Sequence, residues 1–218
     1  MNTLARSPVA PLLERLFAAA ESATSPALAG MSAAERDRLR HSRTEYLALY
    51  AQLKDLWLPV SPETGTLLYM LARSTGARSI IEFGTSFGIS TLHLAAALRD
   101  NGGGRLISSE FEPGKVQRAR EHLLEGGLDD LVDIREGDAL QTLAVDLPAS
   151  IDLVLLDGAK ALYADILDLL EARLAPGALI VADNADDAPD YLARVRSPSS
   201  GYLSVAVGED VEVSMRLG

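Results

Sequence analysis

Asp157, Asp183 and Asn184 each follow an apolar run, DLVLL before the first and ALIVA before the other two. If the two runs are neighbouring strands of a parallel sheet, the three side chains meet at the sheet edge where ligands of such sheets bind. Carboxylate and amide oxygens without histidine or cysteine suit magnesium, manganese or calcium better than zinc. The residues predict a divalent metal site, with solvated acids at strand ends as the alternative.

Lys160 adds a candidate base to this group. It follows Asp157 by three residues and is expected in the first turn of a helix, where the helix dipole disfavours a cation. A nearby divalent ion would lower the pKa of this ammonium further, which suits a general base. A lysine turned to solvent, or one paired with Asp157, is the alternative interpretation.

A glycine loop lies within the stretch IIEFGTSFGIST, residues 80–91. The stretch predicts a strand, a loop and the start of a helix. The backbone can approach a ligand closely at Gly84 and Gly88, and the unpaired amides of the helix point toward it. The two glycines do not have the Gly-x-Gly-x-x-Gly spacing of a dinucleotide site. A different nucleoside cofactor, of which S-adenosylmethionine is the commonest, fits better than a turn that only joins strand to helix.

The same loop also matches a Gly-x-Ser-x-Gly nucleophile elbow, with Ser86 at the serine position. Such an enzyme needs a histidine late in the chain, after its acid. The histidines here are His41, His93 and His122, all ahead of the last strands. A serine hydrolase is therefore excluded.

Other polar residues follow the predicted strands of the first half. Glu110 could accept both hydroxyls of a ribose and would repel a ribose phosphate, although Glu112 competes for this role and a solvated acid is an alternative. Asp138 and Ala139 follow the third strand, where a polar side chain and a small residue could flank an adenine. The pattern indicates a nucleoside site along one sheet edge.

The elements that must position these residues alternate along the chain. Strands are expected at Ser79–Phe83, Arg105–Ser109, Val132–Glu136, Ile151–Leu156 and Ala178–Ala182. Helices are expected at Glu63–Ser74, Ile89–Arg99, Pro113–Glu125, Ala139–Val145 and Lys160–Leu174. Strands separated by helices predict a parallel sheet covered on both faces, and the nearly all-apolar strands agree.

The two ends of the chain differ from this alternation. Residues 1–56 predict peripheral helices, one of them over a pattern that runs from about Ala33 through Leu53. These helices cap a substrate mouth, form a dimer face or serve stability alone. Tyr202–Val207 and Val211–Leu217 predict an antiparallel hairpin added to the sheet edge. Residues 57–218 are expected to form one domain.

Composition narrows the class of partner. The 218 residues carry a formal net charge of -11, with no cysteine. This charge argues against a nucleic acid or an anionic membrane as the main partner, and favours a small molecule. The chain has no cysteine for disulfides or thiolate metal sites, and a reducing compartment is compatible. Glu14 and Arg15 interrupt the only apolar candidate for a signal peptide, so a cytoplasmic protein is expected.

The motifs IIEFGTSFGIST, ISSEFEP, EGDAL, LVLLDGAKALY and LIVADNA together resemble the metal-dependent class I O-methyltransferases, which include catechol and caffeoyl-CoA O-methyltransferases. The resemblance covers roughly residues 56–217. It implies a Rossmann-like α/β fold with a seven-stranded, mostly parallel sheet, an antiparallel last strand and helices on both faces. It also implies that Asp157, Asp183 and Asn184 bind the divalent cation and that Lys160 takes the substrate hydroxyl proton. The residues implied to bind S-adenosylmethionine are Val60, Glu82, Gly84, Thr85, Ser90, Glu110, Asp138, Ala139 and Asp157.

The resemblance predicts methyl transfer from S-adenosylmethionine to a hydroxyl of a small catechol-like vicinal diol, with Mg²⁺, Mn²⁺ or Ca²⁺ bound, in a homodimer. Two departures leave the acceptor open: Ala159 replaces an acid of the plant-type enzymes, and Asp186 to Ala188 replace a stretch with glycine. Two alternatives stay open as well. One is a metal-independent methyltransferase acting on a single hydroxyl, carboxyl or amine, and the other is a non-catalytic S-adenosylmethionine-binding protein.

Overall fold

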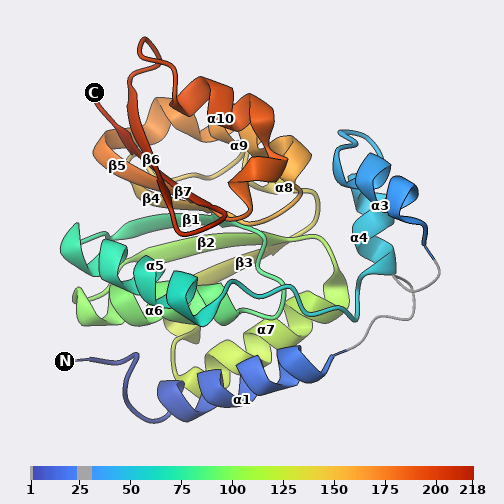
Figure 1. Ribbon diagram of the computed structural model, residues 1–218. Coiled ribbons are helices and arrows are strands. Elements are labelled where there is room, and N and C mark those ends of the chain that lie inside the picture. Colours follow the sequence, from blue (N-terminus) through green and yellow to red (C-terminus); the bar gives the residue numbers. More distant parts are fainter. Residues whose placement is uncertain (1, 24–30) are drawn as a thin grey trace.

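The computed structural model describes residues 2–23 and 31–218, and its centre is a seven-stranded sheet (Figure 1). The strand order is β3-β2-β1-β4-β5-β7-β6, and β7 runs antiparallel to both of its neighbours. The strands are β1 (Ser79–Phe83), β2 (Arg105–Glu110), β3 (Val132–Glu136), β4 (Ile151–Leu156), β5 (Leu174–Ala182), β6 (Tyr202–Val207) and β7 (Val211–Arg216). The predicted sheet with a reversed last strand is confirmed.

Helices cover both faces of this sheet, as predicted (Figure 1). One face carries α1 (Val9–Ser22), α5 (Pro62–Ser74), α6 (Ile89–Asp100) and α7 (Pro113–Gly126). The other carries α8 (Ala139–Thr142), α9 (Tyr163–Leu170) and α10 (Pro189–Val195). Among the described residues, no helix is long and apolar enough to cross a membrane.

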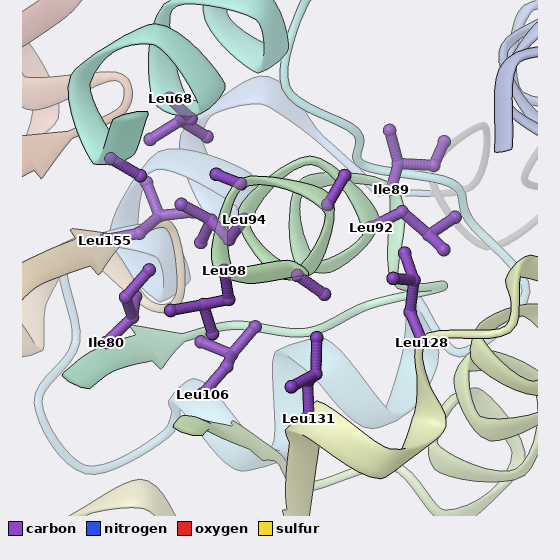
Figure 2. Packing of buried hydrophobic residues seen from close by; sticks show 14 of the residues in the cluster. Leu68, Ile80, Ile89, Leu92, Leu94, Leu98, Leu106, Leu128, Leu131 and Leu155 are labelled. Atoms are coloured by element: carbon purple, nitrogen blue, oxygen red, sulfur yellow. The ribbon is translucent and has the colours of Figure 1, made fainter. Parts of the chain in front are cut away.

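Helix α6 is the most deeply buried helix of the first face, with ten consecutive buried residues. Figure 2 shows Leu94 and Leu98 of α6 among Ile80, Leu106 and Leu155, which come from three adjacent strands. A helix that is apolar on all sides must be enclosed by other elements, and α1 and α5 enclose α6 from the outer side. The glycine loop before α6 is thus attached to a rigid support.

The register of the parallel strands brings the predicted site residues to one edge. Phe83, Leu156 and Ala182 end β1, β4 and β5, and they pair directly across the sheet. The amide of Asp157 donates to the carbonyl of Phe83 at 2.8 Å, and that of Asp183 donates to Leu156 at 3.0 Å. The residues that follow the three strands therefore lie side by side.

Three predicted helical stretches differ from the structure, and one of them, predicted over Ala139–Val145, ends at Thr142 as α8. One continuous pattern from residue 33 to 53 forms two helices, α3 (Ala33–Arg40) and α4 (Tyr46–Gln52), because the hydroxyl of Ser42 accepts from the amides of Thr44 and Glu45 and interrupts the helix. Residues 1 and 24–30 of the N-terminal segment lie outside the described residues.

The predicted helix over Lys160–Leu174 is shorter in the structure. Helix α9 spans eight residues between 3-10 turns at Lys160–Leu162 and Glu171–Arg173, and β5 already begins at Leu174. Pro176 and Gly177 precede the predicted strand Ala178–Ala182, but in the structure they belong to β5 and lie at an irregularity in its pairing with β4. Proline and glycine are tolerated in a strand at such bulges.

Candidate active site

Three adjoining cavities follow the edge where the parallel strands end, and Asp157 lines all of them. Their volumes are about 780, 80 and 10 Å³. The largest is lined by the predicted residues Val60, Asp157, Lys160, Asp183 and Asn184. The second is lined by Gly84, Glu110, Ala139 and Asp157, and the third by Gly84, Thr85, Ser90 and Asp157. Glu82 and Asp138 line none of the three.

The glycine loop between β1 and α6 fits closely against β4. A Cβ atom at Gly84, whose φ is 103°, would lie 2.6 Å from the carbonyl oxygen of Asp157. No side chain fits at that position, because the obstacle is backbone that cannot turn aside. The loop therefore approaches the start of the Asp157 segment as closely as two backbones allow.

Ser86 of this loop does not have the partners of a hydrolytic nucleophile. Its hydroxyl is buried and has no hydrogen-bond partner among the described residues. His93 and His122 each use Nδ1 in a contact with a backbone carbonyl oxygen, at 2.8 Å in both cases. The structure agrees with the sequence in excluding a serine hydrolase site.

Glu110 lies at the end of β2 with its carboxylate held by backbone amides. Oε1 accepts from Phe111 and Glu112, both at 3.0 Å, and Oε2 accepts from Ser86 at 2.8 Å. Burial raises the pKa of Glu110, while these amides and the charge of Lys115 oppose the rise. The competing Glu112 caps α7, accepting from the amide of Lys115 at 2.8 Å.

Glu82 lies behind the cavities, with its side chain fully buried. Its oxygens accept from the hydroxyls of Ser90 at 2.6 Å, Thr91 at 2.7 Å and Ser108 at 2.5 Å. Burial raises its pKa to about 7, against the effect of the three hydroxyls. Glu82 ties the start of α6 to β2, so any effect on a ligand passes through the loop. Asp138 is also structural here, because it caps α8 through the amide of Leu140.

Lys160 is linked to the two acids in the large cavity. Its Nζ donates to Asp157 Oδ1 at 2.9 Å and to the hydroxyl of Tyr163 at 2.8 Å. That hydroxyl donates in turn to the backbone oxygen of Asp183 at 2.8 Å. The pairing with Asp157, which was the alternative interpretation, is present in the structure, and the catalytic role of Lys160 stays a prediction.

Carboxylates outnumber cations in this cluster. Burial and the charge of Asp157 raise the pKa of Asp183 to about 7. Burial also raises the pKa of Asp157, an effect that Lys160 opposes and that Asp210 adds to. Hard oxygen donors that repel one another fit a divalent cation. The described residues contain no group of three or more histidine, cysteine, aspartate or glutamate side chains placed to share an ion, and the predicted set has two carboxylates and one amide.

Asp210 is a member of this cluster that the sequence did not reveal. It lies in the turn between β6 and β7, where its Oδ2 accepts from Asn184 Nδ2 at 2.8 Å and its carbonyl accepts from the amide of Ala185 at 2.8 Å. This contact assigns the nitrogen of the Asn184 amide to Asp210 and leaves the oxygen available. A sequence signal was present: Asp210 lies in a predicted hairpin turn, and β7, the strand after that turn, pairs with β5, which ends just before Asp183 and Asn184.

The N-terminal helices complete the largest cavity. Phe17 of α1 and Leu49 of α4 line it together with Asp157 and Lys160. A cavity that combines apolar side chains with a few polar groups is typical of a site for a small organic ligand.

Comparisons with known proteins match this arrangement. The family model described as "Methyltransferase domain" matches residues 81–185. The chain is 34% identical over 154 residues to a catechol O-methyltransferase of Niastella koreensis, covering 68% of this chain and 69% of that relative. It is 33% identical over 127 residues to a catechol O-methyltransferase of Mycobacterium tuberculosis, and that match spans a little over half of each chain, 58% and 57%.

Solved structures share the fold. The O-methyltransferase TomG of Streptomyces achromogenes, solved in complex with S-adenosylmethionine, superposes with a TM-score of 0.64 at 26% identity, over 84% of this chain and 94% of TomG. A putative O-methyltransferase of Klebsiella pneumoniae has a TM-score of 0.70 at 24% identity, over 98% and 93% of the two chains. The second likeness shows the fold alone.

Proposed function

The chain belongs to the S-adenosylmethionine-dependent O-methyltransferases, and from this membership we propose that it methylates one hydroxyl of a small catechol-like acceptor with the help of a divalent cation. The observation that carries the proposal is the position of Asp157. This carboxylate lines both the cavities beside the glycine loop and the large cavity that holds Lys160 and Asp183. A methyl donor and an acceptor in these cavities would meet at one point.

The cofactor would lie along the ends of β1 to β3. Glu110 would accept a ribose hydroxyl, and its negative charge would disfavour a phosphorylated ribose. The loop before α6 would receive the rest of the molecule, because unpaired amides at a helix start favour a carboxylate. The residues proposed to bind or position S-adenosylmethionine are Val60, Glu82, Gly84, Thr85, Ser90, Glu110, Asp138, Ala139 and Asp157.

Asp157, Asp183 and Asn184 would hold the cation, since their donors are the hard oxygens that magnesium prefers. Such a cation supplies Lewis-acid chemistry at the acceptor oxygen. The three residues also fix where an acceptor with two adjacent oxygens would lie in the large cavity, and positioning of this kind contributes strongly to rate.

Lys160 would act as the general base for the acceptor hydroxyl. In its neutral form, Nζ would take the proton of the acceptor hydroxyl while the oxygen forms a bond to the methyl carbon and the bond from that carbon to sulfur breaks. S-adenosylhomocysteine then leaves uncharged. The ammonium formed on Lys160 would be stabilised by Asp157 Oδ1, which lies 2.9 Å from Nζ.

Turnover with and without chelation tests this function. We expect transfer to catechol to stop in EDTA and to return with added magnesium, and a monophenol to react far more slowly than catechol. Equal rates for both acceptors, or full activity in EDTA, would favour the metal-independent alternative. The cytoplasmic homodimer stays a prediction, and light scattering on the purified protein would test the dimer.

A further inference from the structure

The chain has three lysines, and two of them are buried at the candidate site. Lys54 is exposed, whereas Lys160 and Lys115 are 8% and 4% exposed. Lys160 has two hydrogen-bond partners. The ammonium of Lys115 has neither an ion pair within 4.0 Å nor a hydrogen bond among the described residues, although it lines the 80 Å³ cavity together with Glu110.

Burial of the Lys115 side chain is unfavourable for its charged form, and nearby acids offset this effect only in part. Burial lowers the pKa of Lys115, and the acids that oppose this, Glu110, Glu112 and Asp55, act without direct contact. The position in the first turn of α7 adds a further cost, because the helix dipole disfavours a cation there. Nζ lies 5.4 Å from the centroid of the Phe87 ring, a cation–π contact. Ionisable groups whose pKa values are shifted in this way concentrate at functional sites.

Glu110 lines the same cavity as Lys115, and most of its hydrogen-bond acceptor positions are already occupied. A carboxylate offers about four acceptor positions, two on each oxygen. Oε1 of Glu110 already accepts from two backbone amides, and Oε2 accepts from one. By this count, one acceptor position on Oε2 is left for a ribose hydroxyl. The expectation that Glu110 accepts from both hydroxyls stays a prediction.

We propose that Lys115 is a further cofactor-binding residue, whose ammonium donates to one hydroxyl oxygen of the ribose while Glu110 accepts from the other hydroxyl. The three acids around Lys115 would repel an anionic ligand group, so a neutral oxygen is the acceptor that fits. The inference rests on the proposed function, because the ribose is that of S-adenosylmethionine. It assigns the recognition of the vicinal diol to two residues of opposite charge.

Calorimetric titration with S-adenosylhomocysteine and its 2′-deoxy and 3′-deoxy analogues tests the proposal. Lys115→Met keeps the apolar stem and removes the donor, so affinity for S-adenosylhomocysteine should fall about 10- to 150-fold, the scale of a hydrogen bond to a charged group. Lys54→Met is the matched control and should bind like the wild type. The Lys115→Met variant should bind one deoxy analogue, the one that lacks the hydroxyl contacted by Lys115, almost as well as it binds S-adenosylhomocysteine. The substitution and the missing hydroxyl delete the same interaction, so their effects on affinity should not add.

The outcomes separate the two levels of inference. If the wild-type protein does not bind S-adenosylhomocysteine, the proposed function is wrong. If the wild type binds and Lys115→Met binds equally well, the proposed role of Lys115 is wrong. The role is also wrong if the affinity lost through the substitution and the affinity lost through the missing hydroxyl add for both deoxy analogues. Thermal unfolding of the ligand-free variant should be no lower than that of the wild type, since an unpaired buried charge has been removed. Should the variant fail to fold, the wild type still decides: unchanged affinity for both deoxy analogues would overturn the proposal.

Discussion

The two halves of the candidate site treat buried charge in opposite ways. Beside β1 and β2, Glu82 and Glu110 each accept three hydrogen bonds from hydroxyls or backbone amides. Beside β4 and β5, burial and the charge of Asp157 raise the pKa of Asp183, and the Nζ of Lys160 donates to Asp157 Oδ1. Protein donors satisfy the carboxylates of the first half, whereas the proposed cation would complete the second half. The two halves should therefore respond differently to substitution of their charged residues.

The largest expected effect tests the second half. Lys160→Met should lower kcat by roughly 10²- to 10⁴-fold, the scale of general-base catalysis, because the variant keeps the stem and lacks the proton acceptor. Binding of S-adenosylhomocysteine should change little, since Lys160 lines only the large cavity. The measurement is steady-state turnover with calorimetry on the same samples, and Lys54→Met is the control. A variant as fast as the wild type would leave Lys160 as the structural partner of Asp157.

The second prediction concerns the buried carboxylate Glu82 of the first half and the dependence of stability on pH. The pKa of Glu82 is raised from 4.5 to about 7 in the folded protein, chiefly by burial, so the folded state binds the extra proton. Its contribution to stability is present below pH 4.5 and is lost as pH rises through about 7, on the order of 3 kcal/mol in total. Glu82→Gln should therefore flatten the stability curve between these pH values.

Chemical unfolding of the wild type and Glu82→Gln across this range measures the effect. Asp183 titrates in the same region, so the difference between the two proteins is the quantity to compare. Magnesium should change that difference only slightly, because burial and the three hydroxyls dominate the pKa of Glu82 and the charge of Asp157 is the smallest of its causes. A difference that disappears with magnesium would mean that the two halves are coupled.

The fold could be predicted from the sequence because strong local patterns agree with the tertiary structure. The apolar runs at Ser79–Phe83 and Ile151–Leu156 are strands with the predicted bounds. The parts that were wrong depend on single side chains or on pairing. Ser42 divides a helical pattern by bonding to nearby amides, and Pro176 and Gly177 extend β5 through a bulge. A pattern of hydrophobic residues predicts neither the hydrogen bonds of Ser42 nor the bulge in β5.

The candidate site was predictable as a set of strand-end residues, but its hydrogen bonds were not. The amides that occupy three positions on Glu110 belong to the backbone, which has no signature in residue type. Lys115 reads in the sequence as an ordinary helix lysine, and only its burial distinguishes it. Asp210 is separated from Asn184 by 26 residues and reaches it because β7 inserts next to β5. The ligand roles of the predicted residues stay predictions.

The smallest expected effect concerns Asp210, which contacts the predicted cation ligand Asn184. Asp210 holds the amide nitrogen of Asn184 at 2.8 Å, which fixes the side of that amide left for a cation. Asp210→Ala should weaken magnesium binding about 10-fold, the lower end of the range for residues that orient metal ligands. Asp210→Asn keeps an oxygen acceptor and removes the charge, so it separates orientation from electrostatics. Titration of magnesium, followed by the rise in unfolding temperature, measures both variants without turnover. If orientation dominates, the asparagine variant binds nearly as well as the wild type; equal losses in both variants would assign the effect of Asp210 to its charge.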